Sequence, residues 1–241
     1  MRSSWYFRQG STSRPAQIGW IIFGLIVTMF YFTRRVIVSL GVGGWVDTVD
    51  APVYDWVLEH QIPWVQGLAK VLYWWGSTPG MTATMIVLTL WLCWAKRSWW
   101  PLATVAFTAL GSVLTTILLK RVVAHDRPTG VDPSFPPPES YSFPSGHTLN
   151  ATALIGMISY LAIVYGLYRW RWWLSMCAAL FILLMGASRV YLGHHWVSDV
   201  MVGLLIGAGW GAVVAILHYY FVPRATMTSS RVPGENRATD G

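Results

Sequence analysis

Six long stretches of this chain are almost free of ionisable side chains. Five of them contain no Asp, Glu, Lys, Arg or His, and the sixth contains only His218; they cover residues 18–33, 80–95, 98–119, 148–168, 172–187 and 200–222. A helix needs about 20 apolar residues, at about 1.5 Å each, to cross the hydrocarbon core of a membrane. The shorter stretches approach that length when aromatic or long basic side chains extend them. The sequence therefore predicts an all-α fold, a bundle of six transmembrane helices.

The composition disfavours other classes of protein. Only 11% of the 241 residues are charged, and the mean hydropathy is +0.46, whereas about 25% of the residues in a soluble domain are charged. A soluble globular enzyme and a disordered chain are both poor fits to these values. The net charge of +7 comes without a dense basic patch, so we expect no nucleic-acid partner. Both cysteines lie within apolar stretches, and neither a disulfide nor a zinc site is predicted from them.

The distribution of positive charge predicts the orientation in the membrane. Six spans place both termini on one side, which carries ten Lys and Arg residues against seven on the other. Cytoplasmic segments are enriched in Lys and Arg. We therefore expect an integral protein of the plasma (inner) membrane with both termini in the cytoplasm. A single domain is expected over residues 1–222, followed by a disordered cytoplasmic tail over residues 223–241.

The segment between the first two spans, residues 34–79, is long and predicted to be partly helical. Asp50, Ala51 and Pro52 are typical of a helix start with Asp50 as the cap, and Pro63 is a predicted break. Apolar residues recur at mostly helical spacing after that start. Two arrangements fit the pattern equally well: a helix lying in the outer membrane interface, and a helix packed over the bundle.

Polar residues interrupt the outer ends of the last four spans at three places. They are residues 120–128 (KRVVAHDRP), 143–147 (FPSGH) and 188–199 (SRVYLGHHWVSD). Ionisable side chains close to a bilayer are costly, so they are functional candidates by default. If alternate spans are antiparallel, all three segments lie on the same outer face. We therefore expect them to converge on one site.

The residue types in these segments are suited to holding a phosphoryl group. Lys120, Arg127 and Arg189 supply three cations, and guanidinium groups make forked contacts to phosphate oxygens. Ser145 and Gly146 precede a predicted helix, whose backbone N–H groups and dipole favour an anion. Glycine also permits close approach of the backbone. Together these residues predict a cradle for phosphate and for the charge that develops during its transfer.

Two histidines and one carboxylate add the parts of a nucleophilic mechanism. His195 and Asp199 are four residues apart, which on a helix places them on one face. A carboxylate bonded to one ring nitrogen leaves the other nitrogen free as a nucleophile. His147, from another helix, is expected to protonate the leaving oxygen and then to activate water. His194 is the competing nucleophile, and the spacing to Asp199 favours His195. Because side chains supply the cations, we expect no metal or other cofactor.

Other polar residues have simpler interpretations. Arg121 extends its side chain to the interface, and His125 and Asp126 are interpreted as ordinary loop residues. His218 lies near the opposite end of the last span and is interpreted as an interface residue. A stripe of small residues in that span allows close helix approach, either within the bundle or in a dimer, so the oligomeric state stays open; it consists of Gly203, Gly207 and Gly211.

In order and spacing, the three polar segments resemble the motifs of the type 2 phosphatidic acid phosphatase superfamily. The family pattern is K-x6-R-P, then P-S-G-H, then S-R-x5-H-x3-D, and every fixed position is matched between residues 120 and 199. The resemblance implies an integral membrane lipid phosphatase with its site on the non-cytoplasmic side. It implies that His195 is the nucleophile, Asp199 its orienting partner, and His147 the acid and then the base. It also implies phosphate binding by Lys120, Arg127, Ser145, Gly146 and Arg189.

The expected function is metal-independent hydrolysis of a phosphate ester or diphosphate on a membrane lipid. The reaction would pass through a phosphohistidine intermediate at the periplasmic or extracellular face. Undecaprenyl diphosphate, phosphatidylglycerophosphate and phosphatidate are the candidate substrates, and no sequence feature chooses among them. Three alternatives stay open: a lipid phosphotransferase, an enzyme similar to the vanadium haloperoxidases, and a non-enzymatic lipid-binding or transport protein. The intact motif residues argue against the last.

Overall fold

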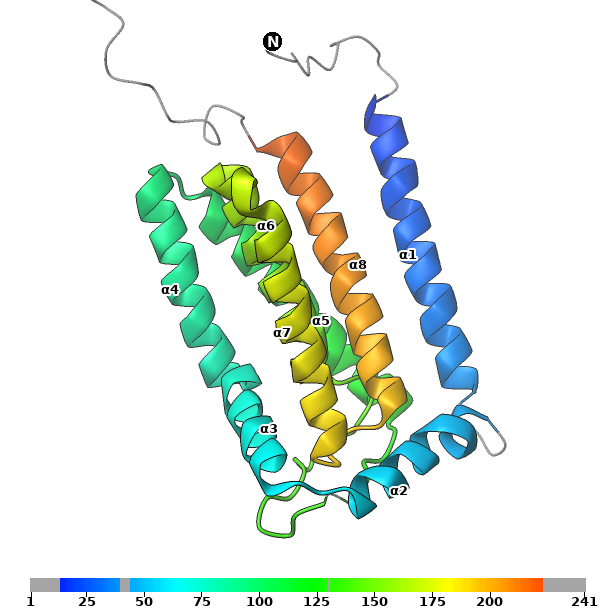
Figure 1. The fold of residues 1–241 in the computed structure, drawn as a ribbon. Coiled ribbons are helices and arrows are strands. Elements are labelled where there is room, and N and C mark those ends of the chain that lie inside the picture. Colours follow the sequence, from blue (N-terminus) through cyan, green and yellow to red (C-terminus); the bar gives the residue numbers. More distant parts are fainter. Residues whose placement is uncertain (1–13, 40–43, 130, 223–241) are drawn as a thin grey trace, which may run out of the picture.

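The regular structure of the described chain is entirely helical. The computed structural model describes residues 14–39, 44–129 and 131–222 (Figure 1), so the predicted tail over residues 223–241 lies outside the described residues. The elements in order are α1 (Arg14–Val38), a π-helical turn η1 (Val46–Asp50), α2 (Ala51–Glu59), α3 (Pro63–Gly76), α4 (Thr78–Lys96), α5 (Trp100–Val123), α6 (Gly146–Ala162), a π-helical turn η2 (Ile163–Leu167), a 3₁₀ turn η3 (Tyr168–Trp170), α7 (Arg171–Tyr191) and α8 (Val197–Phe221). The all-α prediction is confirmed for these residues.

Five helical stretches of the described chain are long and apolar enough to cross a membrane. They are Gln17–Val38, Thr78–Lys96, Trp100–Val123, Gly146–Tyr191 and Val197–Phe221. The fourth is 46 residues long and contains both α6 and α7. These two helices lie side by side in Figure 1, and the chain reverses near Gly166, whose φ is +146°. The count of six passes requires α6 and α7 to cross separately and stays a prediction.

Helix α6 is the centre of the bundle. It contacts α4, α5, α7 and α8, and its Leu154, Met157 and Leu161 are buried in the larger apolar core. The surrounding helices expose large apolar side chains, among them Trp20 of α1 and Val87 of α4. An apolar surface of this extent fits helices that face lipid. The first turn of α6 is thereby surrounded by the ends of the neighbouring helices.

Glycines bring α8 unusually close to α6. A Cβ atom on Gly207 would lie 2.6 Å from the carbonyl oxygen of Leu149, and one on Gly203 would lie 3.0 Å from that of Ser145. Real side chains do not tolerate contacts this short with a backbone, so a larger residue would push the helices apart. The small-residue stripe therefore serves packing within the bundle at these two positions. At Gly211 the corresponding contact is 3.8 Å, which is ordinary.

The segment between the first two spans contains two helices at the end of the bundle that carries the polar segments. The break before Pro63 is confirmed, but the predicted helix start at Ala51 is wrong, because the π-helical turn Val46–Asp50 leads directly into α2. Asp50, however, makes no side-chain hydrogen bond to its own helix. Its carboxylate instead accepts hydrogen bonds from the backbone N–H (2.9 Å) and hydroxyl (2.6 Å) of Ser198, in the first turn of α8. The predicted cap of α2 is thus wrong, because the side chain caps a different helix. Helices α2 and α3 both contact α7, and the interfacial position stays a prediction.

Candidate active site

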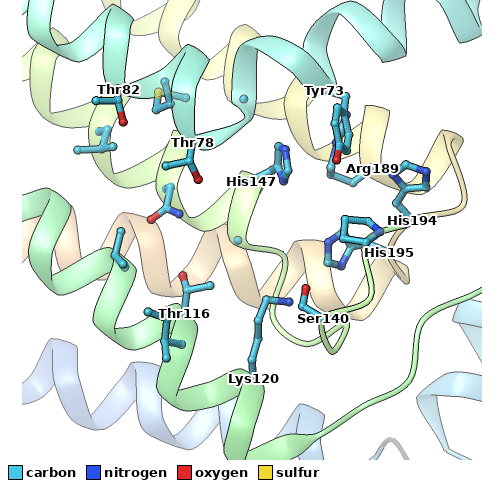
Figure 2. A pocket seen from close by; sticks show the side chains of 18 of the residues that line it. Tyr73, Thr78, Thr82, Thr116, Lys120, Ser140, His147, Arg189, His194 and His195 are labelled. Atoms are coloured by element: carbon cyan, nitrogen blue, oxygen red, sulfur yellow. The ribbon is translucent and has the colours of Figure 1, made fainter. Parts of the chain in front are cut away.

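The three polar segments meet around one cavity at the end of the bundle. The cavity has a volume of about 410 Å³ and is lined by residues of α3 to α7 and of the loops beside them. Six of the eight predicted site residues line it, as Figure 2 shows in part: Lys120, Arg127, Gly146, His147, Arg189 and His195. The two that do not are Ser145 and Asp199. Residues from four distant parts of the sequence therefore share one cavity.

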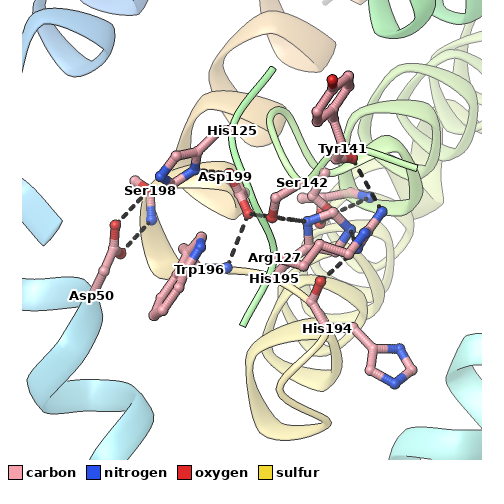
Figure 3. A network of polar contacts seen from close by, with 12 residues as sticks. Asp50, His125, Arg127, Tyr141, Ser142, His194, His195, Trp196, Ser198 and Asp199 are labelled. Carbon is pink, nitrogen blue, oxygen red and sulfur yellow. Dashed lines mark hydrogen bonds and ion pairs between the residues drawn. The ribbon is translucent and has the colours of Figure 1, made fainter. Parts of the chain in front are cut away.

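A tight turn between α7 and α8 presents His195 to the cavity. Gly193 has a φ of +63°, a conformation that favours glycine. His195 follows it, and its Nδ1 lies 3.1 Å from Oδ2 of Asp199 (Figure 3). The same oxygen accepts the backbone N–H of Trp196 at 2.9 Å and the hydroxyl of Ser142. Asp199 thus caps α8 and holds the imidazole in one orientation with a single carboxylate oxygen.

The environment of His195 keeps its ring neutral. Burial lowers the pKa of His195 to about 3, with the positive charge of Arg127 acting in the same direction and the bond to Asp199 opposing it. A neutral ring bonded to a carboxylate through Nδ1–H leaves a lone pair on Nε2. That Nε2 lies 2.9 Å from Nη1 of Arg127, at the wall of the cavity. This is the form that a nucleophilic histidine requires.

The three predicted cations surround the same space but are held differently. Lys120 donates to the carbonyl oxygens of Tyr141 and Ser142. Arg127 donates through Nε to the carbonyl of Ser140 at 2.6 Å, besides its contact with His195. Both side chains are therefore anchored by the backbone of the loop between α5 and α6. Lys120 keeps one further donor for an anion in the cavity. The N–H groups of Arg127 all have protein partners, since Nη1 also donates to the carbonyl of His194 and Nη2 donates to the hydroxyl of Ser140 and the carbonyl of Tyr141. An anion would therefore have to replace one of these partners of Arg127.

Arg189 is fully buried and incompletely bonded. Its Nε and Nη2 donate to the hydroxyl of Ser188 at 3.2 and 3.0 Å, and its guanidinium lies 4.7 Å from the ring centroid of Tyr73. Its Nη1 is buried and finds no hydrogen-bond partner among the described residues. An unsatisfied buried donor on a charged group is costly. A bound anion would satisfy it.

The Pro-Ser-Gly-His segment forms the N-terminus of α6, and its residues have different roles. The hydroxyl of Ser145 accepts from the backbone N–H of Thr148 at 3.4 Å and from its hydroxyl at 2.9 Å, so it caps the helix. Ser145 does not line the cavity, so its expected part in phosphate binding stays a prediction. Gly146 does line it, and a Cβ there would lie 3.1 Å from Cγ2 of Thr116. His147 projects into the cavity, its Nε2 has no hydrogen-bond partner among the residues that the structure describes, and its ring lies 5.1 Å from that of Tyr73.

His194 is engaged elsewhere, unlike its neighbour. Its Nε2 lies 3.1 Å from the carbonyl oxygen of Phe135, and its ring stacks on the Phe135 ring at 5.4 Å. Burial lowers the pKa of His194 to about 4. The carboxylate of Asp199 bonds His195 instead. The geometry therefore supports the choice of His195 that the four-residue spacing suggested.

Comparison with known proteins gives the family. A family model described as the PAP2 superfamily matches residues 100–223, which is 124 of the 241 residues and includes all three polar segments. The chain belongs to the PAP2 superfamily. The family predicted from the motifs is confirmed.

The relatives of this PAP2 protein are named as phosphatases. It is 25% identical to phosphatidylglycerophosphatase B of Bacillus subtilis over 60% of this chain and 71% of the relative. It is 28% identical to the undecaprenyl-diphosphatase of Sulfolobus acidocaldarius over 78% of this chain and 85% of the relative. The crystal structure of a transmembrane PAP2-type phosphatidylglycerolphosphate phosphatase from B. subtilis superposes with a TM-score of 0.70 at 23% identity, covering 78% of this chain and 92% of that one. The fold is shared, the helices are those of an integral membrane protein, and the names fit the predicted enzyme class.

Sequence reasoning missed three residues of the PAP2 site. Tyr73 comes from the segment before the second span and contacts both His147 and Arg189. Ser142 donates to Asp199 from a loop in which the motif fixes no residue. His125 was interpreted as an ordinary loop residue, yet its Nδ1 lies 3.8 Å from Oδ1 of Asp199. Nothing in the motif spacing signals these contacts, because each depends on how loops fold over the bundle. Within the described ranges, no group of three or more His, Cys, Asp and Glu residues is arranged to hold a metal ion.

Proposed function

We propose that this PAP2 protein hydrolyses a phosphate ester or diphosphate on a membrane lipid through a phosphohistidine at His195. One observation carries the proposal: the neutral ring of His195, held by Asp199, exposes Nε2 to the cavity that Lys120, Arg127 and Arg189 also line. A nucleophile and three phosphate-binding cations thus share one space. The phosphatase names of the relatives support the same class of reaction.

The chemistry follows from the placement of these groups. The lone pair of His195 Nε2 attacks phosphorus while the bond between phosphorus and the lipid oxygen breaks. Protonated His147 gives its proton to that oxygen, and the three cations stabilise charge on the phosphoryl oxygens. Neutral His147 then takes a proton from water, which attacks the phosphohistidine and releases inorganic phosphate. Arg127 donates toward Nε2 in the free enzyme and would transfer that hydrogen bond to the phosphate.

The shape of the cavity supports an amphiphilic substrate. Beyond the charged residues, its wall continues along membrane-length helices and becomes apolar; this part is lined by Met81, Ala109, Val113, Ile117 and Leu154. An acyl or isoprenoid chain matches that surface, and the phosphate matches the cations. Undecaprenyl diphosphate, phosphatidylglycerophosphate and phosphatidate meet these requirements.

The arrangement of the bundle supports a site on the non-cytoplasmic face of the plasma membrane. The N-terminal end of α1 and the C-terminal end of α8 lie at the end of the bundle opposite to α2 and α3 (Figure 1), and the cavity is lined by α3 and by the loops before α6 and α8. Four of the seven basic residues at the cavity end have local tasks: Lys70 pairs with Asp132 at 2.7 Å, and Lys120, Arg127 and Arg189 line the cavity. Setting these aside leaves the excess of positive charge at the end with the termini, which we place in the cytoplasm. Separate crossings by α6 and α7 complete six passes within one domain over residues 1–222.

The function is tested with purified protein in detergent, offered lipid monophosphates and diphosphates in EDTA while phosphate release is measured. We expect turnover of at least one lipid, and His195→Ala should lower kcat by about 10³-fold or more because it removes the nucleophile. His194→Ala is the matched control and should retain turnover. Full activity of His195→Ala together with loss of activity in His194→Ala would show that His194, and not His195, is the nucleophile.

The same assay separates the alternatives. Activity that EDTA abolishes would contradict a metal-independent mechanism. A phosphorylated acceptor in place of free phosphate would identify a phosphotransferase. Vanadate should inhibit a phosphatase by occupying the phosphate cradle, whereas a haloperoxidase-like enzyme would require vanadate to oxidise halide. A protein that binds lipid phosphates without releasing phosphate would belong to the non-enzymatic class.

A further inference from the structure

We propose that His125 is a positioning residue of this site: as a cation it faces the free oxygen of Asp199 and keeps that carboxylate charged and oriented for His195. The inference rests on the proposed function, because it assigns a task in the activation of the same nucleophile. It concerns a residue at none of the fixed motif positions.

The two oxygens of Asp199 have very different surroundings. Oδ2 is crowded, since it accepts from His195, Trp196 and Ser142. Oδ1 is buried without a hydrogen-bond partner among the described residues, and the atom facing it is Nδ1 of His125 at 3.8 Å. That Nδ1 is also buried without a hydrogen-bond partner in the described chain. Two complementary buried atoms therefore face one another, and a small rotation of the imidazole would join them.

His125 is held in this place by the same residues that hold Asp199. The backbone N–H of Ser142 donates to the carbonyl of His125 at 2.7 Å. The indole N–H of Trp196 donates to the carbonyl of Asp126 at 2.8 Å. Ser142 and Trp196 each bond Asp199 as well (Figure 3). Ser142 and Trp196 thus each hold the backbone at His125 or Asp126 and also bond the carboxylate of Asp199, which fixes His125 relative to that carboxylate.

The negative charges around His125 favour the protonated, cationic form of its ring. Asp199 of α8, Asp50 of η1 and the neighbouring Asp126 act on it, and Asp50 and Asp199 are both buried. Burial raises the pKa of Asp50, and the charge of Asp199 acts in the same direction. Within the described chain, neither forms an ion pair with Lys or Arg. Protonated His125 is the counter-charge that lies between them.

The protonation of His125 follows from these contacts. Its interaction with Asp199 raises the pKa of His125 above that of a free imidazole, and burial only partly opposes this. A raised pKa means that the cation is fully present at lower pH and is lost as the pH rises through the raised value. Asp199 then loses the charge that faces Oδ1, and the orientation of His195 is weakened. The expected signature is an alkaline decline in kcat.

The experiment measures kcat and KM against pH for the wild type, His125→Ala and His125→Gln on the lipid that the panel identifies. We expect His125→Ala to lower kcat about 10- to 100-fold with little change in KM, because His125 does not line the cavity proposed to hold the substrate. His125→Gln keeps a donor but cannot lose a proton, so it should recover part of kcat and lack the alkaline decline of the wild type. His60→Gln makes the same substitution at an exposed histidine of the same face and should match the wild type.

Two results would overturn the inference: wild-type kcat in His125→Ala, or a pH profile of His125→Gln that superimposes on that of the wild type. If His125→Ala does not fold, as judged by thermal unfolding in detergent, the profile of His125→Gln decides. His195→Ala is assayed in parallel. If it remains active, or if the wild type releases no phosphate, the proposed function is wrong and the inference falls with it. If it is inactive while the His125 variants behave as wild type, only the inference is wrong.

Discussion

Arg189 shows how a single side chain can reveal the ligand of this cavity. A buried guanidinium costs several kcal/mol in solvation unless its donors are satisfied. The hydroxyl of Ser188, the carbonyl of Ala69 and the face of Tyr73 satisfy only part of it. The donor left over, Nη1, belongs to a residue that lines the cavity. An anion that binds in the cavity during each turnover would satisfy this donor.

We predict that Arg189→Lys lowers kcat/KM by about 100-fold or more. Lysine keeps the positive charge but loses the planar fork, and with it both the contacts to Ser188 and the donor Nη1 that has no partner in the described chain. The measurement is phosphate release from the preferred lipid, together with the concentration of vanadate that halves the rate, which should rise. Arg169→Lys, at an exposed arginine at the opposite end of the bundle, is the control. Unchanged kinetics in Arg189→Lys would remove Arg189 from the phosphate cradle.

At the scale of elements, the contact between α6 and α8 sets the geometry of the site. His147 lies in the first turn of α6 and Asp199 in the first turn of α8. The two turns are further joined by a hydrogen bond from the N–H of Ser145 to the carbonyl of Asp199 at 3.1 Å. Gly203 and Gly207 permit this approach because they have no Cβ. The distance between the predicted acid and the predicted nucleophile therefore depends on glycines that touch neither.

Gly207→Ala should lower both stability and activity. Its Cβ would lie 2.6 Å from the carbonyl of Leu149 and 2.7 Å from Cβ of Thr152, and overpacking of this kind costs about 1–3 kcal/mol. We expect a lower midpoint of thermal unfolding in detergent and a reduced kcat. Gly156→Ala on α6 adds the same methyl group where nothing lies within 4 Å, so it should leave both quantities nearly unchanged. Equal effects of the two substitutions would contradict a specific role for the close packing.

At the scale of the whole molecule, polarity is separated along the axis of the bundle. The chain reversals between α4 and α5 and between α6 and α7 lie at one end of the bundle, together with the start of α1 and the C-terminal end of α8. These reversals carry Lys96, Arg97, Arg169 and Arg171. The cavity, the loop between α5 and α6, and helices α2 and α3 occupy the other end. A membrane crossing between the two ends would place the cavity on one face of the membrane and these four basic residues on the other.

A cysteine-accessibility experiment tests this orientation. In a chain with Cys93→Ala and Cys177→Ala, a membrane-impermeant maleimide should label Glu139→Cys in intact cells, because Glu139 is exposed in the loop over the cavity. Arg169→Cys, exposed at the other end, should react only after the membrane is permeabilised. The reverse pattern would invert the topology, and labelling of both positions in intact cells would contradict a single orientation.

The sequence by itself determined the helices, the family and most of the cavity. Hydropathy and residue type act locally, because the cost of placing a side chain in lipid depends on that side chain and its immediate neighbours. The pairing of His195 with Asp199 is also local, since only four positions separate them, although His195 lies in the turn before α8 and not on the helix itself. For these reasons the apolar stretches, the motif residues and the choice of His195 over His194 were all open to prediction from the amino-acid order.

Only the tertiary structure decided which partners those residues meet. Asp50 caps α8 rather than α2, across 148 positions of sequence, and Ser145 turns its hydroxyl toward α6 rather than into the cavity. His125 reaches the site from a variable position of the first motif, and Tyr73 from a helix outside all three motifs. Each of these contacts is set by the close packing of α6 and α8 and by the loops folded over them. Such packing is a property of surfaces brought together in space, and no local pattern in the chain encodes it.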